Sequence, residues 1–436
     1  MNKRLLFIAL FIANSLHPLA QNGWKICTAP VFKSRVDDIF MIHGQTGYAV
    51  CGDGQIVKST DSGNTWRTIF RDTNMYFRSV EFINEQIGFV GGFPFKGVHQ
   101  NIFLKTLDGG NTWHDLTPNI APRARGGICG LAVADSNTIY GCGNWFTDSA
   151  YIIKSYDGGF SWIIMDMRPY ATSLIDLYFT SKDTGFATGR AGIKYGDPSS
   201  AIILYTTDGG ITWTKKFENN DDNEYCWKIQ RLTDKVYFAS IQDYNPADSN
   251  KPSILKSVDG GMSWTKYFVR DSIYNIEGIG FIDSLKGFTG GGKEGSFESV
   301  DGGKTWIPNS ICPYMDRVFR VSDNVLFATG FQIWKYERGT NVNTVPIPGP
   351  SYIYLKCYPN PVSGFLEIDF TLSRATRAVL NIYDGQGKTV RQIVNADEAA
   401  GGYHYSINTG NYANGVYYVL LRTHEDKQAV KVIVNH

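Results

Sequence analysis

Beyond its first twenty residues the chain has no long apolar run, and its cysteines form no metal-type Cys-x-x-Cys pair. Extended stretches of Ala, Leu, Glu and Lys with a helical period are also missing, which excludes a helical bundle. The net charge of +1 provides no overall field to attract nucleic acid or an anionic membrane. We therefore expect a monomer with no metal ion, cofactor, nucleic-acid partner or transmembrane segment.

Glycine and aromatic residues are abundant instead. The 436 residues include 46 glycines, and aromatic residues make up 14% of the chain. This composition indicates many short strands joined by tight turns. The length suits one large all-β body and a smaller module.

The first twenty residues have the layout of a secretory signal peptide. Lys3 and Arg4 provide the positively charged N-terminal region, and an apolar stretch runs over 5–16. Ala20 is the small residue expected before the cleavage site. A membrane anchor is the alternative, but the stretch is shorter than the roughly 20 residues that span a bilayer. We expect residues 1–20 to be removed and the mature protein to be exported.

Seven cysteines in an exported chain permit disulfides, although the number is odd. Cys129 and Cys142 flank a predicted turn at 135–137, and in a regular hairpin they would face each other. A Cys129–Cys142 disulfide and two buried thiols are both consistent with this arrangement.

A repeated motif determines the predicted architecture. Six segments read Ser/Thr-x-Asp-x-Gly-x-Thr/Ser-Trp, and their aspartates lie 47, 49, 51, 51 and 42 residues apart, which is the length of one four-stranded propeller blade. The motif residues are Asp61, Asp108, Asp157, Asp208, Asp259 and Asp301, with Trp66, Trp113, Trp162, Trp213, Trp264 and Trp306.

Each residue type in this motif suits a tight hairpin. The aspartate accepts hydrogen bonds from turn N–H groups, the glycines allow positive φ, and the tryptophan packs between blades. The motif resembles the Asp box of sialidase-like and related propellers. The resemblance implies a structural role for these aspartates and no role in catalysis.

The two ends of the repeat region indicate how the ring closes. Three strands without a box are predicted over 318–321, 325–330 and 332–336, and the missing fourth strand is predicted at 23–28. Pairing these segments leaves no exposed sheet edge. The predicted fold is thus all-β: a seven-bladed β-propeller with Asp-box hairpins over 21–337, with six blades as the alternative.

A polar, proline-rich linker is predicted over 338–352, followed by a small antiparallel β-sandwich over 353–436. This module contains Tyr-Pro-Asn-Pro at 358–361, Asn-Ile-Tyr-Asp at 381–384, Asn-Gly-Val-Tyr-Tyr-Val at 414–419 and a terminal Lys-Val-Ile-Val. These residues resemble the type A sorting domain of the type IX secretion system. The resemblance implies contact with that machinery and a product that is extracellular or attached to the outer-membrane surface. An Ig-like binding domain is the alternative.

Arginines recur in the connections that lead into new blades, on the face where propellers usually bind ligands. Guanidinium groups suit carboxylate or phosphate partners, although nearby aspartates such as Asp37 and Asp166 offer these arginines internal partners. The candidate ligand-binding residues are Arg35, Arg71, Arg123, Arg125, Arg168, Arg270 and the aromatic Tyr170.

Three functions are consistent with these features. A sialidase would need the Arg-Ile-Pro motif, for which Arg35-Val36-Asp37 is a poor substitute. The repeats and the Gly-Phe-x-x-Gly strands resemble the photosystem II stability and assembly factor family, which implies a protein-binding scaffold. Glycan recognition is the third. We favour noncatalytic binding of a protein or glycan, with a sialidase-like or xyloglucanase-like glycoside hydrolase as the alternative. An arginine triad, a tyrosine and two carboxylates together on the axis would favour catalysis.

Overall fold

The structure is a computed structural model that divides into two compact units, one ending at Arg338 and one beginning at Gly339. No helix among the described residues has the length and hydropathy needed to cross a bilayer. The structure describes residues 23–95, 102–120, 126–143, 150–192, 200–219, 224–243, 251–270, 275–292, 295–309, 311–338, 353–372, 375–399, 401–423 and 427–436. The predicted signal peptide and nearly all of the predicted linker therefore lie outside the described residues.

The described strands of the first unit form seven four-stranded antiparallel sheets, and α1 (Thr117–Ile120) follows β9. The strands of each sheet are given from the innermost to the outermost. Sheet 1 is β2 (Val36–Ile42), β3 (Thr46–Cys51), β4 (Gln55–Ser59) and β5 (Arg67–Arg71); sheet 2 is β6 (Met75–Phe82), β7 (Gly88–Pro94), β8 (Phe103–Thr106) and β9 (His114–Asp115); sheet 3 is β10 (Ile128–Val133), β11 (Ile139–Gly143), β12 (Tyr151–Ser155) and β13 (Ile163–Asp166); sheet 4 is β14 (Ser173–Phe179), β15 (Gly185–Arg190), β16 (Ala201–Thr206) and β17 (Thr214–Glu218). Sheet 5 is β18 (Glu224–Arg231), β19 (Tyr237–Asp243), β20 (Ser253–Ser257) and β21 (Thr265–Phe268); sheet 6 is β22 (Ile276–Phe281), β23 (Gly287–Gly291), β24 (Ser296–Ser299) and β25 (Ile307–Asn309); sheet 7 is β26 (Arg317–Ser322), β27 (Val325–Thr329), β28 (Ile333–Glu337) and β1 (Trp24–Ile26).

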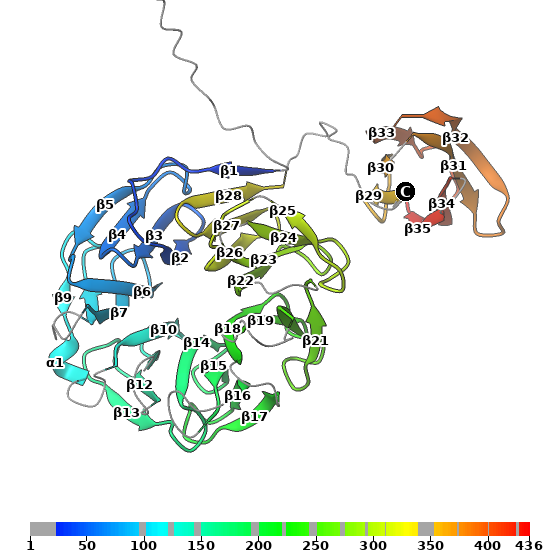
Figure 1. The fold of residues 1–436 in the computed structure, drawn as a ribbon. Helices are drawn as coiled ribbons and strands as arrows, with labels where there is room; N and C mark the ends of the chain where they lie inside the picture. The colour runs from blue at the N-terminus through cyan, green and yellow to red at the C-terminus, as the bar shows by residue number, and fades with distance from the viewer. Residues whose placement is uncertain are drawn as a thin grey trace, which may run out of the picture. The chain divides into compact units, whose positions relative to one another are not determined.

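The sheets follow one another around a ring, as in a propeller (Figure 1). The first and last strands of the unit lie side by side, because Trp24 pairs with Tyr336 in antiparallel register. Trp24 is fully buried, with its ring centroid 5.0 Å from that of Phe288 in sheet 6 and 5.3 Å from that of Tyr336. The predicted pairing of the N-terminal strand with the last strands is confirmed.

Each Asp box lies between the third and fourth strands of its sheet and is a closed hydrogen-bonded turn. In sheet 3, Asp157 Oδ1 accepts from the N–H of Ser161 at 2.9 Å, and Asp157 Oδ2 accepts from its hydroxyl at 2.6 Å. The Ser155 hydroxyl donates to Asp157 and accepts from the N–H of Gly159. The other five boxes have equivalent bonds from the hydroxyl residue to the aspartate.

The second glycine of the box also permits close packing between sheets. Gly159 has a φ of +83°, and a Cβ at this position would lie 2.6 Å from the Phe89 ring of sheet 2. A Cβ added at Gly63 or Gly261 would lie 2.3 Å from the Phe327 ring or 2.5 Å from the Phe186 ring of the preceding sheet. The box therefore forms part of the contact between neighbouring sheets.

A lysine in the third strand connects each of several sheets to the box of the next one. Its ammonium group donates to the carbonyl of the first box glycine in the following sheet. The four pairs, with Nζ–O distances of 2.7, 2.9, 2.8 and 2.7 Å, are Lys58–Gly109, Lys105–Gly158, Lys154–Gly209 and Lys256–Gly302. Tyr205 and Glu298 occupy the equivalent positions in sheets 4 and 6.

The second unit consists of two antiparallel sheets that share one apolar core, which includes Leu380, Val419 and Ile368. One sheet has the order β29-β30-β33 and the other the order β32-β31-β34-β35. Their bounds are β29 (Ile353–Tyr358), β30 (Phe365–Leu372), β31 (Thr376–Asp384), β32 (Thr389–Glu398), β33 (Gly401–Asn408), β34 (Gly415–Arg422) and β35 (Lys427–Val434).

Replacing Gly159 by Val should destabilise the first unit by about 2–4 kcal/mol, because a side chain there would have an unfavourable positive φ and would collide with Phe89. Asp157→Ala should also lower its melting temperature, since the turn loses its acceptor. Thermal unfolding followed by circular dichroism measures both effects. Gly364→Val is the control, because no atom lies within 4 Å of the added Cβ. Melting like the parent protein would contradict a structural role for the box.

Lys154→Met should cost about 1–3 kcal/mol, because the buried ammonium group donates to Gly209 and lies 4.8 Å from the centroid of the Tyr140 ring. Urea unfolding curves give the change in free energy. The exposed Lys304→Met is the control and should differ from the parent by less than about 0.5 kcal/mol. Equal losses in both variants would show that the contact between sheets contributes nothing specific.

Candidate functional site

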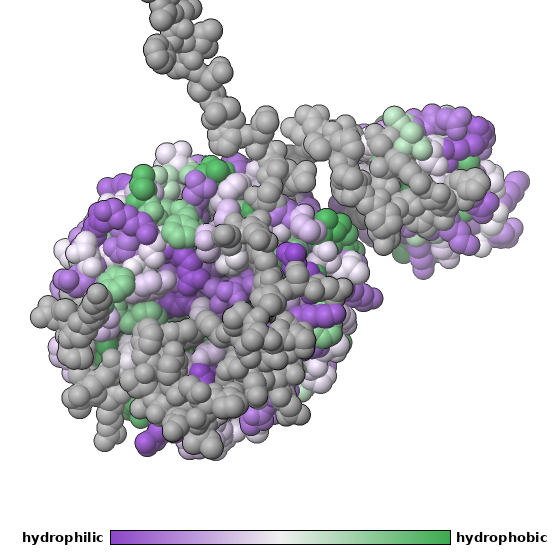
Figure 2. Space-filling view, in the orientation of Figure 1, coloured by the Kyte–Doolittle hydropathy of each residue, from purple (hydrophilic) through white to green (hydrophobic). Residues whose placement is uncertain are grey.

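The innermost strands of the ring share an irregularity near their start. β2, β6, β10, β14, β18 and β22 each have a break in register with the second strand of their sheet. A β-bulge of this kind turns a side chain out of the regular alternation. The residues within the breaks include Asp37, Arg78 and Glu277, so the bulges provide charged groups at the centre of the ring. Figure 2 shows hydrophilic residues around that centre on the face turned to the viewer.

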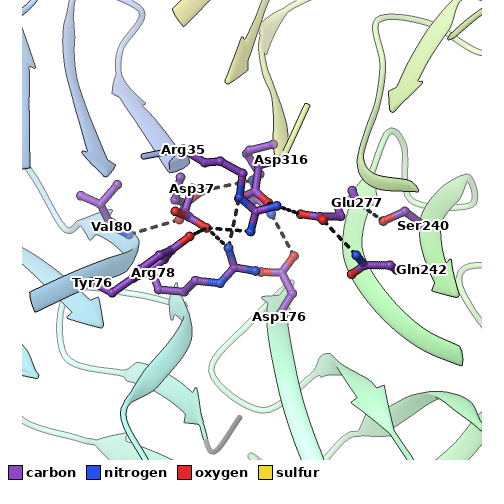
Figure 3. Close-up of polar contacts among 12 residues, drawn as sticks. Arg35, Asp37, Tyr76, Arg78, Val80, Asp176, Ser240, Gln242, Glu277 and Asp316 are labelled. Carbon is purple, nitrogen blue, oxygen red and sulfur yellow. Dashed lines mark hydrogen bonds and ion pairs between the residues drawn. The ribbon is translucent and has the colours of Figure 1, made fainter. Parts of the chain in front are cut away.

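Side chains from four neighbouring sheets meet there and point toward one another (Figure 3). We call them the axial cluster: Arg35, Asp37, Tyr76, Arg78, Glu277 and Asp316. Arg35 forms ion pairs with Glu277 and, at 3.4 Å, with Asp316. Arg78 forms ion pairs with Asp37 and, at 3.0 Å, with Asp316. Glu277 Oε1 also accepts a hydrogen bond of 2.9 Å from Gln242.

A second set of charges crosses the ring beside the axial cluster. Arg317 of sheet 7 lies 3.3 Å from Asp38 of sheet 1 and 2.9 Å from Asp176 of sheet 4. The Arg78 guanidinium lies 4.8 Å from the ring centroid of Trp227 in sheet 5. These contacts therefore join sheets that lie on opposite sides of the axis.

Burial and neighbouring charges change the pKa values in the cluster. Burial, and then the neighbouring Asp316, raises the pKa of Asp37 to about 7. Burial and Asp316 also raise the pKa of Glu277 well above its usual value. Burial opposes ionisation of Asp316, but Arg35 and Arg78 outweigh it and hold the pKa of that carboxyl below its usual range. The side chain of Arg35 is 24% exposed, whereas Asp37 and Asp316 are fully buried.

The axis thus has the residue types that would favour catalysis: the arginines Arg35, Arg78 and Arg317, the tyrosine Tyr76, and several carboxylates. Their contacts differ from those of a ready catalytic site. Each of the three guanidinium groups is paired with carboxylates of the chain itself. The Tyr76 hydroxyl donates to Asp37 at 3.1 Å, and burial and Asp37 raise the pKa of Tyr76, which disfavours a phenolate nucleophile.

Among the residues predicted from the sequence, the structure brings Arg35 into the axial cluster. Arg71 is exposed at the end of β5, and the exposed Arg168 is paired with Asp166. The Arg270 guanidinium lies 5.6 Å from the ring centroid of Phe297, and Tyr170 packs against the core around sheets 3 and 4. Arg123 and Arg125 lie outside the described residues.

The candidate residues selected from the sequence include Arg35, with Asp37 as its internal partner, but not Arg78, Glu277 or Asp316. Arg78 lies within the inner strand β6 and not in a connection between sheets, where the sequence predicted the arginines. A usable signal was present for Glu277, which is the one charge between Asn275 and Ile282, whereas Arg78 shares its strand with Glu81. Asp316 had no such signal, since it precedes its strand.

Cys129 lies within the break in the register of β10. Cys142, in β11, is therefore paired with Gly130 of β10 and not with Cys129. Burial, and then Cys129, raises the pKa of Cys142 well above its usual value. A disulfide between the two residues stays a prediction. Among the described residues, no group of three or more His, Cys, Asp or Glu side chains is arranged to hold a metal ion.

Arg78→Met should destabilise the first unit by about 3–5 kcal/mol, because it leaves Asp37 and Asp316 buried with one guanidinium fewer. Equilibrium unfolding in urea measures the loss. Arg67→Met, on the exposed outer strand β5, is the matched control and should change stability by less than about 0.5 kcal/mol. A loss no larger than that of the control would rule out a structural role for the ion pairs.

Family models match two parts of the chain. Residues 356–435 match the secretion system C-terminal sorting domain. This domain marks the chain for export to the cell surface or the extracellular space and for contact with the secretion machinery. Residues 16–126 match the model of the photosynthesis system II assembly factor YCF48. No curated protein matches the chain.

Solved structures share the fold at low sequence identity. A structure described as YCF48 bound to D1 peptide aligns with a TM-score of 0.53 and 17% identity over 73% of this chain and 98% of its own. YCF48 from Cyanidioschyzon merolae gives 0.55 and 17% over 72% and 99%. The GH74 enzyme of Niastella koreensis gives 0.52 and 13% over 94% and 74%. The chain is therefore a BNR-like β-propeller that resembles the photosystem II assembly factors, followed by a secretion-system C-terminal sorting domain.

Proposed function

We propose that this protein is an exported, noncatalytic propeller that binds a protein segment on the ring face where consecutive sheets are connected. The single observation that carries the proposal is the pairing of charges in the axial cluster. Arg35 and Arg78 are bound to carboxylates of the chain itself, so neither is left to position a substrate. A site whose charged side chains are paired with one another supports a rigid scaffold better than it supports catalysis.

The proposal includes the following organisation. The seven sheets are seven blades of one closed propeller over 21–337, fastened by the Asp boxes. The signal peptide 1–20 is removed on export. The linker 338–352 leads to a β-sandwich over 353–436, which is removed or anchored at the outer-membrane surface after it has engaged the type IX machinery.

Aromatic residues beside the axial cluster support a protein ligand. Tyr76, which donates to Asp37, stacks on Phe93 with ring centroids 5.5 Å apart, and contacts Phe95 edge-on at 5.9 Å. Phe95 is 42% exposed. An exposed aromatic ring that packs against a second ring offers a packing surface for an apolar side chain. The solved YCF48 structure with a bound peptide shows that one propeller of this fold binds a peptide. A glycan is the other ligand that such rings accept.

A glycoside hydrolase is the second candidate. The observation that favours it is the presence of Arg35, Arg78, Arg317, Tyr76 and buried carboxylates on one axis. Two carboxyl groups with different proton occupancy are the usual requirement for glycosidic cleavage, and Asp316 and Glu277 differ in this way.

We expect the mature protein to bind to peptides or glycans displayed on arrays. It should release no product from a fluorogenic sialoside or a xyloglucan oligosaccharide. The combined change of Arg123, Arg125 and Arg168 to Ala should leave unfolding unchanged and weaken an acidic ligand by about tenfold. Lys304→Ala, on the Asp-box side, is the control. Unchanged binding would discard the arginine loops as a site. Hydrolysis that Glu277→Gln abolishes without unfolding the protein would establish the second candidate.

A further inference from the structure

The axial cluster contains more carboxyl groups than cations. Asp37, Glu277 and Asp316 face the guanidinium groups of Arg35 and Arg78. Lys228 acts on Asp316 and also on Asp38, which together with Asp176 is paired with Arg317. In this joined set the carboxyl groups are Asp37, Asp38, Asp176, Glu277 and Asp316, one more than the four cations Arg35, Arg78, Arg317 and Lys228. If every group were ionised, one negative charge would be left unbalanced among side chains that are almost fully buried. An unbalanced buried charge is costly, and a carboxyl group in such a place takes up a proton instead.

Two oxygen atoms show where the proton is needed. Asp37 Oδ2 and Asp316 Oδ1 are both buried and accept no hydrogen bond, although Asp316 Oδ1 lies 3.4 Å from the Arg35 guanidinium. The two carboxyl groups converge on one donor, because Arg78 Nη1 forms ion pairs with Asp37 Oδ1 and with Asp316 Oδ2. Carboxylates only accept hydrogen bonds, so a hydrogen bond between these two groups requires a proton on one of them. The same proton would balance the charge of the cluster.

We propose that Asp37, Asp316 and Glu277 hold one shared proton in the folded propeller, and that its loss loosens the junction of sheets 6, 7, 1 and 2. The three carboxyl groups come from β22, from the residue before β26, and from β2. These sheets include sheet 7, which the first and last strands of the unit complete. The proton therefore stabilises the part of the ring that is closed by the pairing of the first and last strands.

The surroundings of Asp37 determine the direction of the pH effect. It faces Arg35 from the segment before β2, Tyr76 and Arg78 from β6, and Asp316 from the start of sheet 7. Glu277 of β22 and Lys228 of β18 act on Asp316 in turn. The pKa of Asp37 is about 7 in the folded chain, above its ordinary value of 3.8. Its stabilising contribution is therefore complete below that ordinary value and is lost as the pH rises through about 7.

The test is urea unfolding of the mature chain, parent against Asp37→Asn, from about pH 5 to about pH 8. Asparagine keeps the shape of a protonated carboxyl but does not titrate. Up to about pH 7, the folding equilibrium constant of the parent should fall relative to that of Asp37→Asn by up to about tenfold per pH unit. Asp183→Asn, at an exposed carboxyl, should follow the parent. Parallel curves for the parent and Asp37→Asn would overturn the proposal.

Infrared spectroscopy of the parent provides a second measurement that does not depend on how the variant folds. A protonated carboxyl has a C=O stretch distinct from that of a carboxylate. The folded parent should show this band at about pH 6 and lose it above about pH 8. If the parent protein lacks the band at about pH 6, the proposal is overturned. If the parent shows the band and the variants Glu277→Gln and Asp37→Asn lack it, the proton belongs to the cluster.

Discussion

The contact between the Asp-box turn of one sheet and the second and third strands of the preceding one holds the ring together. Within the turn, Asp157 and its counterparts bind the N–H and hydroxyl groups that follow them. Between sheets, a box glycine receives an aromatic ring and another offers its carbonyl to a lysine, as Gly159 and Gly209 do. The motif recurs at blade length because every such contact needs the same turn.

This fastening leaves the other side of the ring available for function. Antiparallel strands alternate in direction, so the segments between consecutive sheets lie at the opposite end from the Asp boxes. Arg35 and the aromatic group of Tyr76 and Phe95 belong to that end. A ligand bound at that end, as proposed, would contact these segments without disturbing the turns that maintain the ring, which is the usual division between scaffold and function.

The centre of the ring depends on a balance of buried charges. Arg78 alone contacts Asp37, Asp316 and the ring of Trp227, and these residues belong to three different sheets. Such a network adds little net stability when complete, but it is costly to break and specifies one arrangement. One defined arrangement suits the proposed binding role, and the sorting domain directs the chain to the cell surface or the extracellular space.

The sequence by itself determined the all-β class, the box turns, the pairing of the N-terminal strand and the sorting domain. These features depend on local chemistry, because a turn needs particular residues at fixed spacing. The Asp box at Asp157 can therefore be recognised without knowing which sheets lie beside it. Only the tertiary structure decided the candidate site. Asp37, Arg78, Glu277 and Asp316 lie up to 279 residues apart, and no local pattern links them. They meet because bulges turn side chains from separate sheets toward one axis, and closure of the ring brings those sheets together.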